Sequence, residues 1–238
     1  MKITIVSALV VSATSFAPNA RTGRTSTAVL DTLNGWSPDE SEFAWGLPGA
    51  LPPFEGGFDP LGLSTGTPLS TMKQWREAEV QHSRVAMLAA LGMLVVEEPI
   101  EYHPLFEAYN KDIGPAIRHL DEVDAVSPFF LAFLTIAIGS VEWNRALRGF
   151  SKPEGSFAFQ QLNDSYYPGD VGFDPLNLKP SDPEEFAAMQ TKELQNGRLA
   201  MLGAAGMIAQ ELVDGKEIFV SLGLAADRFD PSSVPIQF

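Results

Sequence analysis

The hydrophobic and polar positions of the chain fall into three stretches of helical periodicity. The first, at about 72–98, starts polar, ends apolar and is stopped by Pro99. The second, at about 126–148, opens with an uncharged run of roughly 17 residues, near the lower limit for a helix that crosses a membrane. The third, at about 184–212, is again polar first and apolar second. This pattern predicts an all-α membrane protein with three transmembrane helices.

An internal repeat relates the first predicted helix to the third. The segment GFDPLGL at 57–63 recurs as GFDPLNL at 172–178, and EVQHSRVAM at 79–87 recurs as ELQNGRLAM at 193–201. The offset is 115 residues for one motif and 114 for the other, which chance rarely produces. Helices that carry the same motif should enter the membrane from the same side, which requires one crossing between them. The repeat therefore predicts three spans, with the first and third crossed and related by a pseudo-two-fold axis.

The ionisable residues inside the first and third predicted helices need partners, because an unpaired charge in lipid costs at least a few kcal/mol. Within each helix the Glu and the Arg are five positions apart, roughly 140° around the axis, which is poor for pairing. Two helices that cross face to face would instead bring Glu79 to Arg198 and Glu193 to Arg84. Close crossing needs small residues. The candidates are Ala86, Ala89, Ala90 and Gly92 in the first helix and Gly197, Ala200, Gly203, Ala204 and Gly206 in the third.

A glutamate that is neutralised by an arginine keeps free lone pairs, and oxygen is the donor that magnesium prefers. A magnesium ion held in a ring needs only one axial ligand. His82 and Asn196 each lie three residues after a glutamate, and Gln210 lies about four turns beyond Asn196. On the second helix, Glu142 and Arg145 are spaced to pair with each other, which would leave Glu142 a free oxygen. Plainer alternatives stay open: purely structural ion pairs, a satisfied polar histidine and an ion pair at a helix end.

Composition argues against several other functions. The formal net charge is −14 and no basic cluster is present to neutralise phosphates, so nucleic acid is not expected as a partner. The chain has no cysteine, which rules out disulfides, zinc–thiolate sites and thiol nucleophiles. Three histidines leave little for a histidine-rich metal site.

Residues 1–30 have the pattern of a targeting leader. Lys2 precedes an apolar run at 3–13, which is long enough for a signal segment and too short to span a bilayer with ease. A basic, hydroxyl-rich and acid-free stretch follows at 21–27. A signal followed by a transit peptide resembles the bipartite leader of proteins sent into plastids of red-algal secondary origin; ordinary secretion is the alternative. The chain is thus divided into a leader, 1–30, and a three-helix domain, 31–238.

The repeated motifs resemble those of the light-harvesting chlorophyll-binding proteins. The resemblance rests on Glu-x-x-His-x-Arg-x-Ala-Met in the first helix and Lys-Glu-x-x-Asn-Gly-Arg-x-Ala-Met in the third. It covers about 46–215 and includes both Phe-Asp-Pro-Leu boxes. It implies two long crossed helices locked by two ion pairs, with a third helix alongside. The axial ligands of chlorophyll magnesium that it implies are Glu79, His82, Glu142, Glu193, Asn196 and Gln210.

The same resemblance implies further members of the cofactor-binding set. Arg84, Arg145 and Arg198 belong to it as partners of the glutamates. Lys192 would lie near a pigment or a lipid headgroup. The two Phe-Asp-Pro-Leu boxes would lead carotenoids into the grooves beside the crossing.

Two departures from the green-plant pattern resemble the fucoxanthin chlorophyll a/c-binding branch of red-lineage algae, in agreement with the leader. Leu134 stands where that pattern has Gln, and no His follows Asn196. The segments at 114–120, 134–139 and 190–198 look closer to the stress-related, photoprotective members and their photosystem I-associated relatives. This branch implies chlorophyll a, chlorophyll c and carotenoids of the fucoxanthin or diadinoxanthin type as cofactors.

The resemblance implies a non-enzymatic protein of the plastid thylakoid membrane. It would hold pigments as a light-harvesting antenna that passes excitation energy to a photosystem, or would dissipate that energy for photoprotection. The implied partners are the photosystem I or II core, other antenna subunits and membrane lipid. The alternative from another class is a di-iron carboxylate membrane oxidase, which places Glu-x-x-His on two helices of a bundle. Glu79 and His82 match one half of that pattern, but Glu193 and Asn196 break the other half.

Overall fold

A computed structural model gives the fold of the chain. It describes residues 33–54, 56–97, 100, 102, 114–120, 123, 127–151 and 161–225. The predicted leader, 1–30, lies outside these residues and stays a prediction. Within them the regular elements are helices, with no β-strand, and a single isolated bridge joins Phe150 to Leu162.

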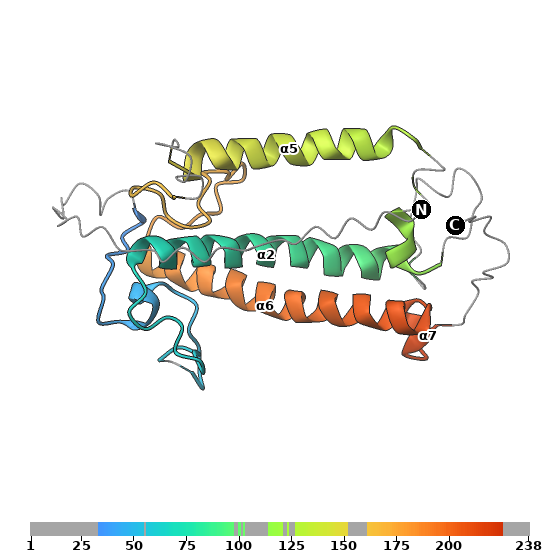
Figure 1. Ribbon diagram of the computed structural model, residues 1–238, viewed down its shortest axis with the longest axis horizontal. Coiled ribbons are helices and arrows are strands. Elements are labelled where there is room, and N and C mark those ends of the chain that lie inside the picture. The colour runs from blue at the N-terminus through green and yellow to red at the C-terminus, as the bar shows by residue number, and fades with distance from the viewer. Residues whose placement is uncertain are drawn as a thin grey trace, which may run out of the picture.

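Three long helices form the body of the molecule. In Figure 1, α2 (Leu69–Val96) lies between α5 (Phe130–Gly149) and α6 (Pro183–Asp214). The short elements are η2 (Phe43–Gly46), η3 (Ala116–Arg118) and α7 (Ile218–Ser221). The three long helices begin and end within four residues of the helices that the sequence pattern predicts. By hydropathy, no helix in the described part of the chain is apolar over a long enough stretch to cross a membrane, so the three spans stay a prediction.

Local sequence signals set both ends of α6. The carboxylate of Asp182 accepts hydrogen bonds from the backbone N–H groups of Glu184 and Glu185, each at 3.1 Å. Pro183 occupies the first helical position, where its missing N–H has no helical partner to lose. At the other end Gly215 adopts a left-handed conformation, with φ of 63°, which glycine reaches without steric cost.

The backbones of α2 and α6 approach closely where Gly197 faces Ser83. Ser83 is fully buried, and a Cβ atom on Gly197 would lie 2.2 Å from the Cβ of Ser83. Only a glycine permits this separation. The expected contact by small residues is therefore present at Gly197. It was wrong for Gly92, Gly203 and Gly206, where a Cβ would meet no atom within 4 Å, because these glycines lie on exposed faces of their helices.

A small hydrophobic core closes one end of the long helices. Its buried members are Leu33, Ala44, Leu47, Met72 and Tyr167, and Trp36, Trp45 and Phe186 pack against it. The ring of Tyr167 meets Trp36 and Phe186 edge to face, at centroid distances of 5.7 and 5.6 Å. This core ties the loops that precede α2 and α6 to the first turns of both helices.

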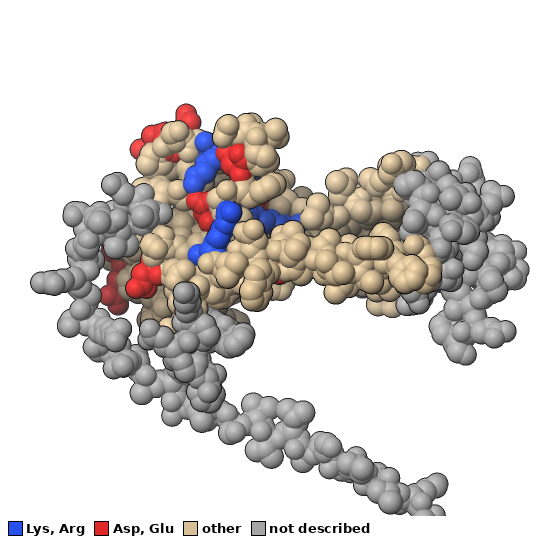
Figure 2. Space-filling view, turned by 90° about the horizontal axis from the view of Figure 1, so that it is seen from above, with Lys and Arg blue, Asp and Glu red and all other residues tan. Residues whose placement is uncertain are grey.

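The outward faces of the long helices are apolar and exposed. Phe133 on α5, Leu88 on α2 and Leu202 on α6 are 71, 73 and 76% exposed. In Figure 2 the charged side chains on this face gather toward one end of the helices, and the rest of the described surface there is uncharged. Apolar faces of this extent favour an apolar environment, because soluble monomers rarely leave them uncovered.

The close approach at Gly197 predicts a specific sensitivity. Gly197→Ala places a methyl group against Ser83, and we expect it to destabilise the helix pair by about 1–3 kcal/mol. Gly203→Ala is the matched control, since its methyl enters open space on the same helix and should be neutral or slightly stabilising. Thermal unfolding followed by circular dichroism in detergent measures both. Equal melting temperatures for the two variants would contradict the prediction.

Candidate functional site

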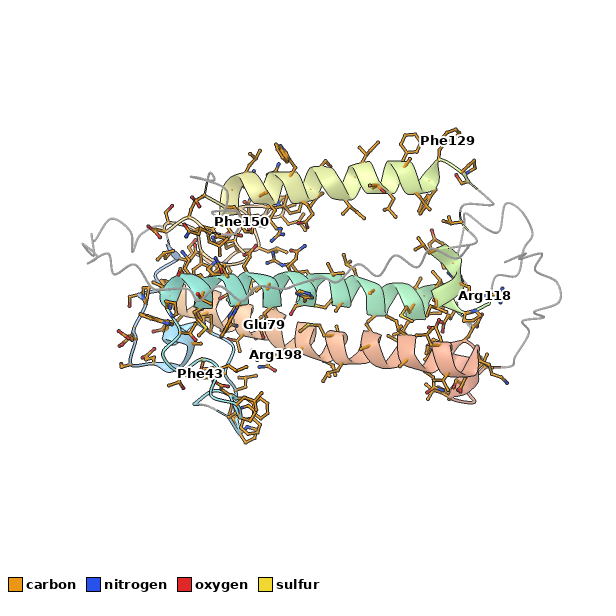
Figure 3. All side chains as sticks on the ribbon, in the orientation of Figure 1. Phe43, Glu79, Arg118, Phe129, Phe150 and Arg198 are labelled. Atoms are coloured by element: carbon orange, nitrogen blue, oxygen red, sulfur yellow. The ribbon has the colours of Figure 1, made fainter. Side chains whose placement is uncertain are left out.

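The two Glu–Arg pairs that the repeat predicts are present across α2 and α6. Nε of Arg84 donates to Oε1 of Glu193 at 2.7 Å, and Nε of Arg198 donates to Oε1 of Glu79 at 2.9 Å. Figure 3 shows Glu79 and Arg198 next to each other between the two helices. In both pairs the arginine holds Oε1 of the carboxylate, so Oε2 keeps its capacity to accept.

Both arginines also reach a loop carbonyl from the other half of the repeat. Nη1 of Arg84 donates to the carbonyl oxygen of Gly169 at 2.9 Å, and Nη1 of Arg198 donates to that of Gly49 at 2.6 Å. These loops precede α6 and α2 respectively. The pseudo-two-fold relation therefore extends from the helices to the loops that flank them.

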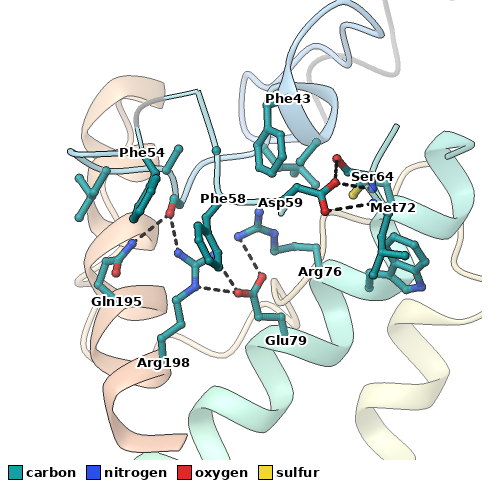
Figure 4. A pocket seen from close by; sticks show the side chains of 18 of the residues that line it. Phe43, Phe54, Phe58, Asp59, Ser64, Met72, Arg76, Glu79, Gln195 and Arg198 are labelled. Carbon is teal, nitrogen blue, oxygen red and sulfur yellow. Dashed lines mark hydrogen bonds and ion pairs between the residues drawn. The ribbon is translucent and has the colours of Figure 1, made fainter. Parts of the chain in front are cut away.

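Arg76 breaks this symmetry. Its side chain is only 8% exposed, and its Nη1 lies 3.4 Å from Oε2 of Glu79. That buried nitrogen nevertheless donates no hydrogen bond. Figure 4 shows Arg76 and Arg198 approaching Glu79 from two sides. The residue 114 positions later is Gln190, whose side-chain oxygen accepts from the Tyr167 hydroxyl at 2.5 Å.

On α5, Glu142 and Arg145 pair as their spacing predicts. Nε of Arg145 donates to Oε2 of Glu142 at 2.8 Å, and Nε2 of Gln81 donates to Oε1 of Glu142 at 2.8 Å. The prediction of an entirely free oxygen on Glu142 was wrong, because the Gln81 amide from α2 reaches it. Oε2 also lies 2.7 Å from Nη2 of Arg145, so the remaining acceptor position of Glu142 is on Oε1, beside the Gln81 amide.

Glu77 is, beside Gln81, a second residue of this network that sequence reasoning missed. Its Oε1 accepts from Nη1 of Arg145 at 2.9 Å, and its Oε2 accepts from the Gly169 N–H at 2.6 Å and the Tyr166 hydroxyl at 3.1 Å. Burial, followed by the charge of Glu77, raises the pKa of Tyr166 well above its usual range. Glu77 thus joins α2, α5 and the loop before α6 at one point.

The remaining three predicted ligands are His82, Asn196 and Gln210. Each side chain donates a hydrogen bond within the protein and keeps one acceptor atom that no donor occupies. Nδ1 of the exposed His82 lies 2.7 Å from the Ala78 carbonyl oxygen, which leaves Nε2. The Asn196 amide N–H donates to the Lys192 carbonyl at 2.8 Å, which leaves its oxygen. The Gln210 amide N–H donates to Ser221 at 3.0 Å and also to Asp214, which again leaves its oxygen. All three are exposed; His82 and Asn196 bond within their own helix, and Gln210 bonds to α7 as well.

Two grooves lie beside the helix crossing, one at each half of the repeat. The first groove, about 660 Å³, is lined among others by Phe43, Phe54, Phe58, Trp75, Arg76 and Glu79. The second groove, about 1000 Å³, is lined among others by Arg84, Phe173, Phe186, Lys192, Glu193 and Asn196. Lys192 is exposed at the second groove, on the helix position next to Glu193. Each groove therefore combines an aromatic wall with one Glu–Arg pair.

The aspartate of each Phe-Asp-Pro-Leu box shapes its groove. Asp59 accepts from the Ser64 hydroxyl at 2.6 Å and from the N–H groups of Ser64 and Leu63 at 2.7 and 3.0 Å. Asp174 accepts from the N–H groups of Lys179 and Leu178, both at 2.9 Å. The Ser64 hydroxyl lowers the pKa of Asp59, and the Lys179 amide lowers the pKa of Asp174.

A second interhelical arrangement, also missed from sequence, closes the opposite end of α2 and α6. A carboxylate oxygen of Glu97 accepts from the Ile218 N–H at 2.7 Å, and Oε2 of Glu211 accepts from the Ile117 N–H at 2.8 Å. Each glutamate thus binds the first turn of the short helix that follows the other long helix. Oε1 of the buried Glu211 has no hydrogen-bond donor among the residues that the structure describes.

Two helices from an internal repeat, locked by reciprocal ion pairs, carry outward acceptor atoms and a groove on either side. This arrangement suits a protein that holds flat ring-bound metals and long apolar molecules. The family model of the chlorophyll a-b binding proteins matches residues 43–212, and the chain belongs to this family.

Individual relatives show which members of this family the chain is similar to. Light-harvesting complex stress-related protein 3.2 of Chlamydomonas reinhardtii is 46% identical over 215 residues, covering 89% of this chain and 80% of the relative. A fucoxanthin-chlorophyll a-c binding protein of Isochrysis galbana is 48% identical over 177 residues, covering 73 and 80%. Photosystem I chlorophyll a/b-binding protein 6 of Arabidopsis thaliana is 34% identical over 183 residues, covering 74 and 64%.

These relatives confirm the resemblance and set the general role of the chain. It has a light-harvesting or photoprotective antenna role, and nothing supports the di-iron oxidase alternative. All three relatives are chloroplastic by name, which supports a plastid location.

The crossed pairs predict severe effects from removing one partner. Arg84→Leu leaves the Glu193 carboxylate uncompensated, and we expect a loss of about 3–5 kcal/mol in an environment that excludes water. The double variant Arg84→Leu with Glu193→Leu strands no charge and should recover part of that loss. Arg148→Leu, which removes an exposed arginine at the end of α5, is the control. Thermal melts in detergent report all three. If Arg84→Leu were as stable as Arg148→Leu, the crossed Glu–Arg pairs would not be the main interaction that holds α2 and α6 together.

The lowered pKa values of Asp59 and Asp174 predict that the turns of the two Phe-Asp-Pro-Leu boxes are sensitive to acid. A carboxyl whose folded-state pKa is lowered contributes stability above its ordinary value of 3.8, and this contribution is lost as pH falls through the lower folded-state pKa. We expect the N–H groups of Leu63, Ser64, Leu178 and Lys179 to stay protected at pH 5 and to lose protection below the ordinary value. Hydrogen exchange normalised to intrinsic rates measures this. Asp59→Asn should remove the acid transition in the first box alone, whereas Glu184→Gln should leave both boxes unchanged.

Proposed function

We propose that this chain holds chlorophylls and carotenoids in the thylakoid membrane and passes excitation energy to a photosystem. The observation that carries the proposal is the reciprocal pairing across α2 and α6, which holds Glu79 and Glu193 by Oε1 and leaves Oε2 of each as an acceptor. A neutralised carboxylate with a free oxygen is a suitable axial ligand for ring-bound magnesium. Bound chlorophyll supplies the absorption of light and the transfer of excitation; the protein supplies fixed spacing and orientation.

The proposed axial ligands are Glu79, His82, Glu142, Glu193, Asn196 and Gln210. The donor chemistry supports this set. His82, Asn196 and Gln210 donate hydrogen bonds within the protein and keep one acceptor atom each, and the three glutamates are held by arginines and keep at least one acceptor position. Arg84, Arg145 and Arg198 act by fixing the carboxylates. Lys192, exposed at the second groove, is proposed to lie near a pigment or lipid headgroup.

We further propose that α2, α5 and α6 span the membrane, with carotenoids in the two grooves. The exposed apolar faces of the three helices support a lipid and pigment environment, since lipid and pigment tails would cover them. The aromatic walls of the grooves suit long apolar molecules. The pigments proposed are chlorophyll a, chlorophyll c and carotenoids of the fucoxanthin or diadinoxanthin type.

Relatives support the choice of partners and the balance of roles. The stress-related name of one relative supports a photoprotective quenching role beside harvesting, and the photosystem I name of another supports association with a photosystem. Other antenna subunits and membrane lipid complete the proposed partners. The proposed role is structural and energetic, and it includes no catalysed reaction.

Reconstitution of the full chain with chlorophylls and carotenoids in detergent tests the proposal. We expect a coloured, folded complex, and we expect His82→Ala to lose about one chlorophyll per protein while the helices stay assembled, because it removes an axial ligand and touches neither ion pair. His119→Ala, a histidine outside the ligand set, should keep the full complement. Absorption spectra and pigment extraction provide the counts. A colourless wild type would refute the function, and an unchanged ratio in His82→Ala would remove that ligand alone.

A further inference from the structure

Gln81 contacts the oxygen of Glu142 that keeps room for a ligand. Nε and Nη2 of Arg145 both lie against Oε2 of Glu142, at 2.8 and 2.7 Å, whereas Nε2 of Gln81 donates to Oε1 at 2.8 Å. Oε1 has a second lone pair, which the Gln81 amide does not use. A magnesium ion at this carboxylate would therefore bind the same atom that Gln81 holds.

Arg145 by itself does not fix the direction of that lone pair. Both of its donors meet a single oxygen, and a carboxylate held at one atom can turn about it. The Gln81 amide holds the second oxygen and so prevents this rotation. Glu77, one helical turn before Gln81 on α2, accepts from Nη1 of Arg145 at 2.9 Å. Two successive turns of α2 thus hold the Glu142–Arg145 pair of α5.

The first half of α5 has no such support within the described part of the chain. Residues 132–141, nearly three turns of the helix, are all exposed. Glu142 and Arg145 lie in the second half, where α5 meets α2 and the loop before α6. The rotation of α5 about its axis, and with it the direction of Glu142, therefore depends on contacts in this short region.

The repeat supplies no second copy of the contact between Gln81 and Glu142. The equivalent residue in α6, Gln195, donates to the Gly49 carbonyl at 3.0 Å, because α5 has no counterpart in the repeat. A hydrogen bond to a ligating oxygen fixes its orientation and changes its strength as a donor. Outer partners of this kind alter metal affinity by about ten- to a hundredfold.

We propose that Gln81 is the positioning residue of the pigment site at Glu142, where its amide sets the orientation of the ligating oxygen and, through it, the affinity and the absorption band of one chlorophyll. The inference rests on the proposed function, which makes Glu142 an axial ligand. It goes further because it assigns control of a site on α5 to a residue of α2 that is not itself a ligand.

Reconstitution of the full chain at increasing ratios of chlorophyll to protein tests the proposal. Glu142→Leu, in which Arg145 keeps Glu77 as a partner, should lose the chlorophyll of this site, and its difference spectrum against the wild type identifies that pigment. Gln81→Met keeps the length of the side chain without a donor. It should bind the identified chlorophyll about ten- to a hundredfold more weakly and displace its absorption band at excess pigment. Gln195→Met is the matched control and should equal the wild type in both.

Gln81→Lys separates the donor from the mere bulk of the side chain. Lysine offers a donor of similar reach, so this variant should restore the affinity that Gln81→Met loses. An affinity in Gln81→Lys no higher than in Gln81→Met counts against the amide as a donor. If Gln81→Met does not assemble, Gln81→Lys decides alone: affinity close to the wild type supports the inference, and weakened binding counts against it.

The remaining outcomes separate this inference from the proposed function. A wild type that binds no pigment overturns the function. If Glu142→Leu keeps every chlorophyll, Glu142 is not a ligand, and the inference falls while the other ligands stand. The inference alone is overturned if Gln81→Met binds the identified chlorophyll as tightly as Gln195→Met does, or if Gln81→Met and Gln81→Lys both lose all their pigments.

Discussion

Arg84 and Arg198 are paired from the neighbouring helix, because the glutamate five positions earlier on the same helix points elsewhere around its axis. The reciprocal Glu–Arg pairing across α2 and α6 therefore dictates how the two helices cross. It brings Gly197 against Ser83, which admits no side chain at that point. It also orders two loops, since each guanidinium has donors left over for the carbonyl of Gly49 or Gly169. The same geometry leaves Oε2 of each glutamate outside the crossed pair, although in Glu79 this oxygen also lies 3.4 Å from Nη1 of Arg76.

The pseudo-two-fold relation has a different result at the other end of the helices. Glu97 and Glu211 occupy equivalent positions, 114 residues apart, like the glutamates of the crossed pairs. A two-fold axis brings unlike charges together only when the two residues occupy different positions of the repeat. Where the same position carries the same residue type in both halves, two side chains of like charge face each other. The two carboxyls consequently face each other, and backbone N–H groups of Ile117 and Ile218 supply the donors that arginines supply at the first end.

Much of this could be predicted from the sequence because the repeat carries long-range information. The three helices, the two crossed pairs and the Glu142–Arg145 pair follow from spacing alone. Glu97 and Glu211 are separated by the same 114-residue offset as Glu79 and Glu193, so the repeat could have identified them as well. Gln81 and Glu77 could not. The partner of Gln81 lies on α5, which has no counterpart in the repeat, and the repeat equivalent of Glu77 is the uncharged Thr191.

A third helix beside a two-fold pair must give equivalent residues different neighbours. Gln81 and Gln195 are equivalent, yet Gln81 donates to Glu142 on α5 whereas Gln195 donates to the Gly49 carbonyl in the loop before α2. The position of Arg76 has diverged further, since its equivalent is an uncharged glutamine bonded to a tyrosine. Identical motifs therefore do not make identical sites. The surroundings set by α5 and by the two loops distinguish one groove from the other, and differences in ligand chemistry should be sought at these positions rather than in the shared motifs.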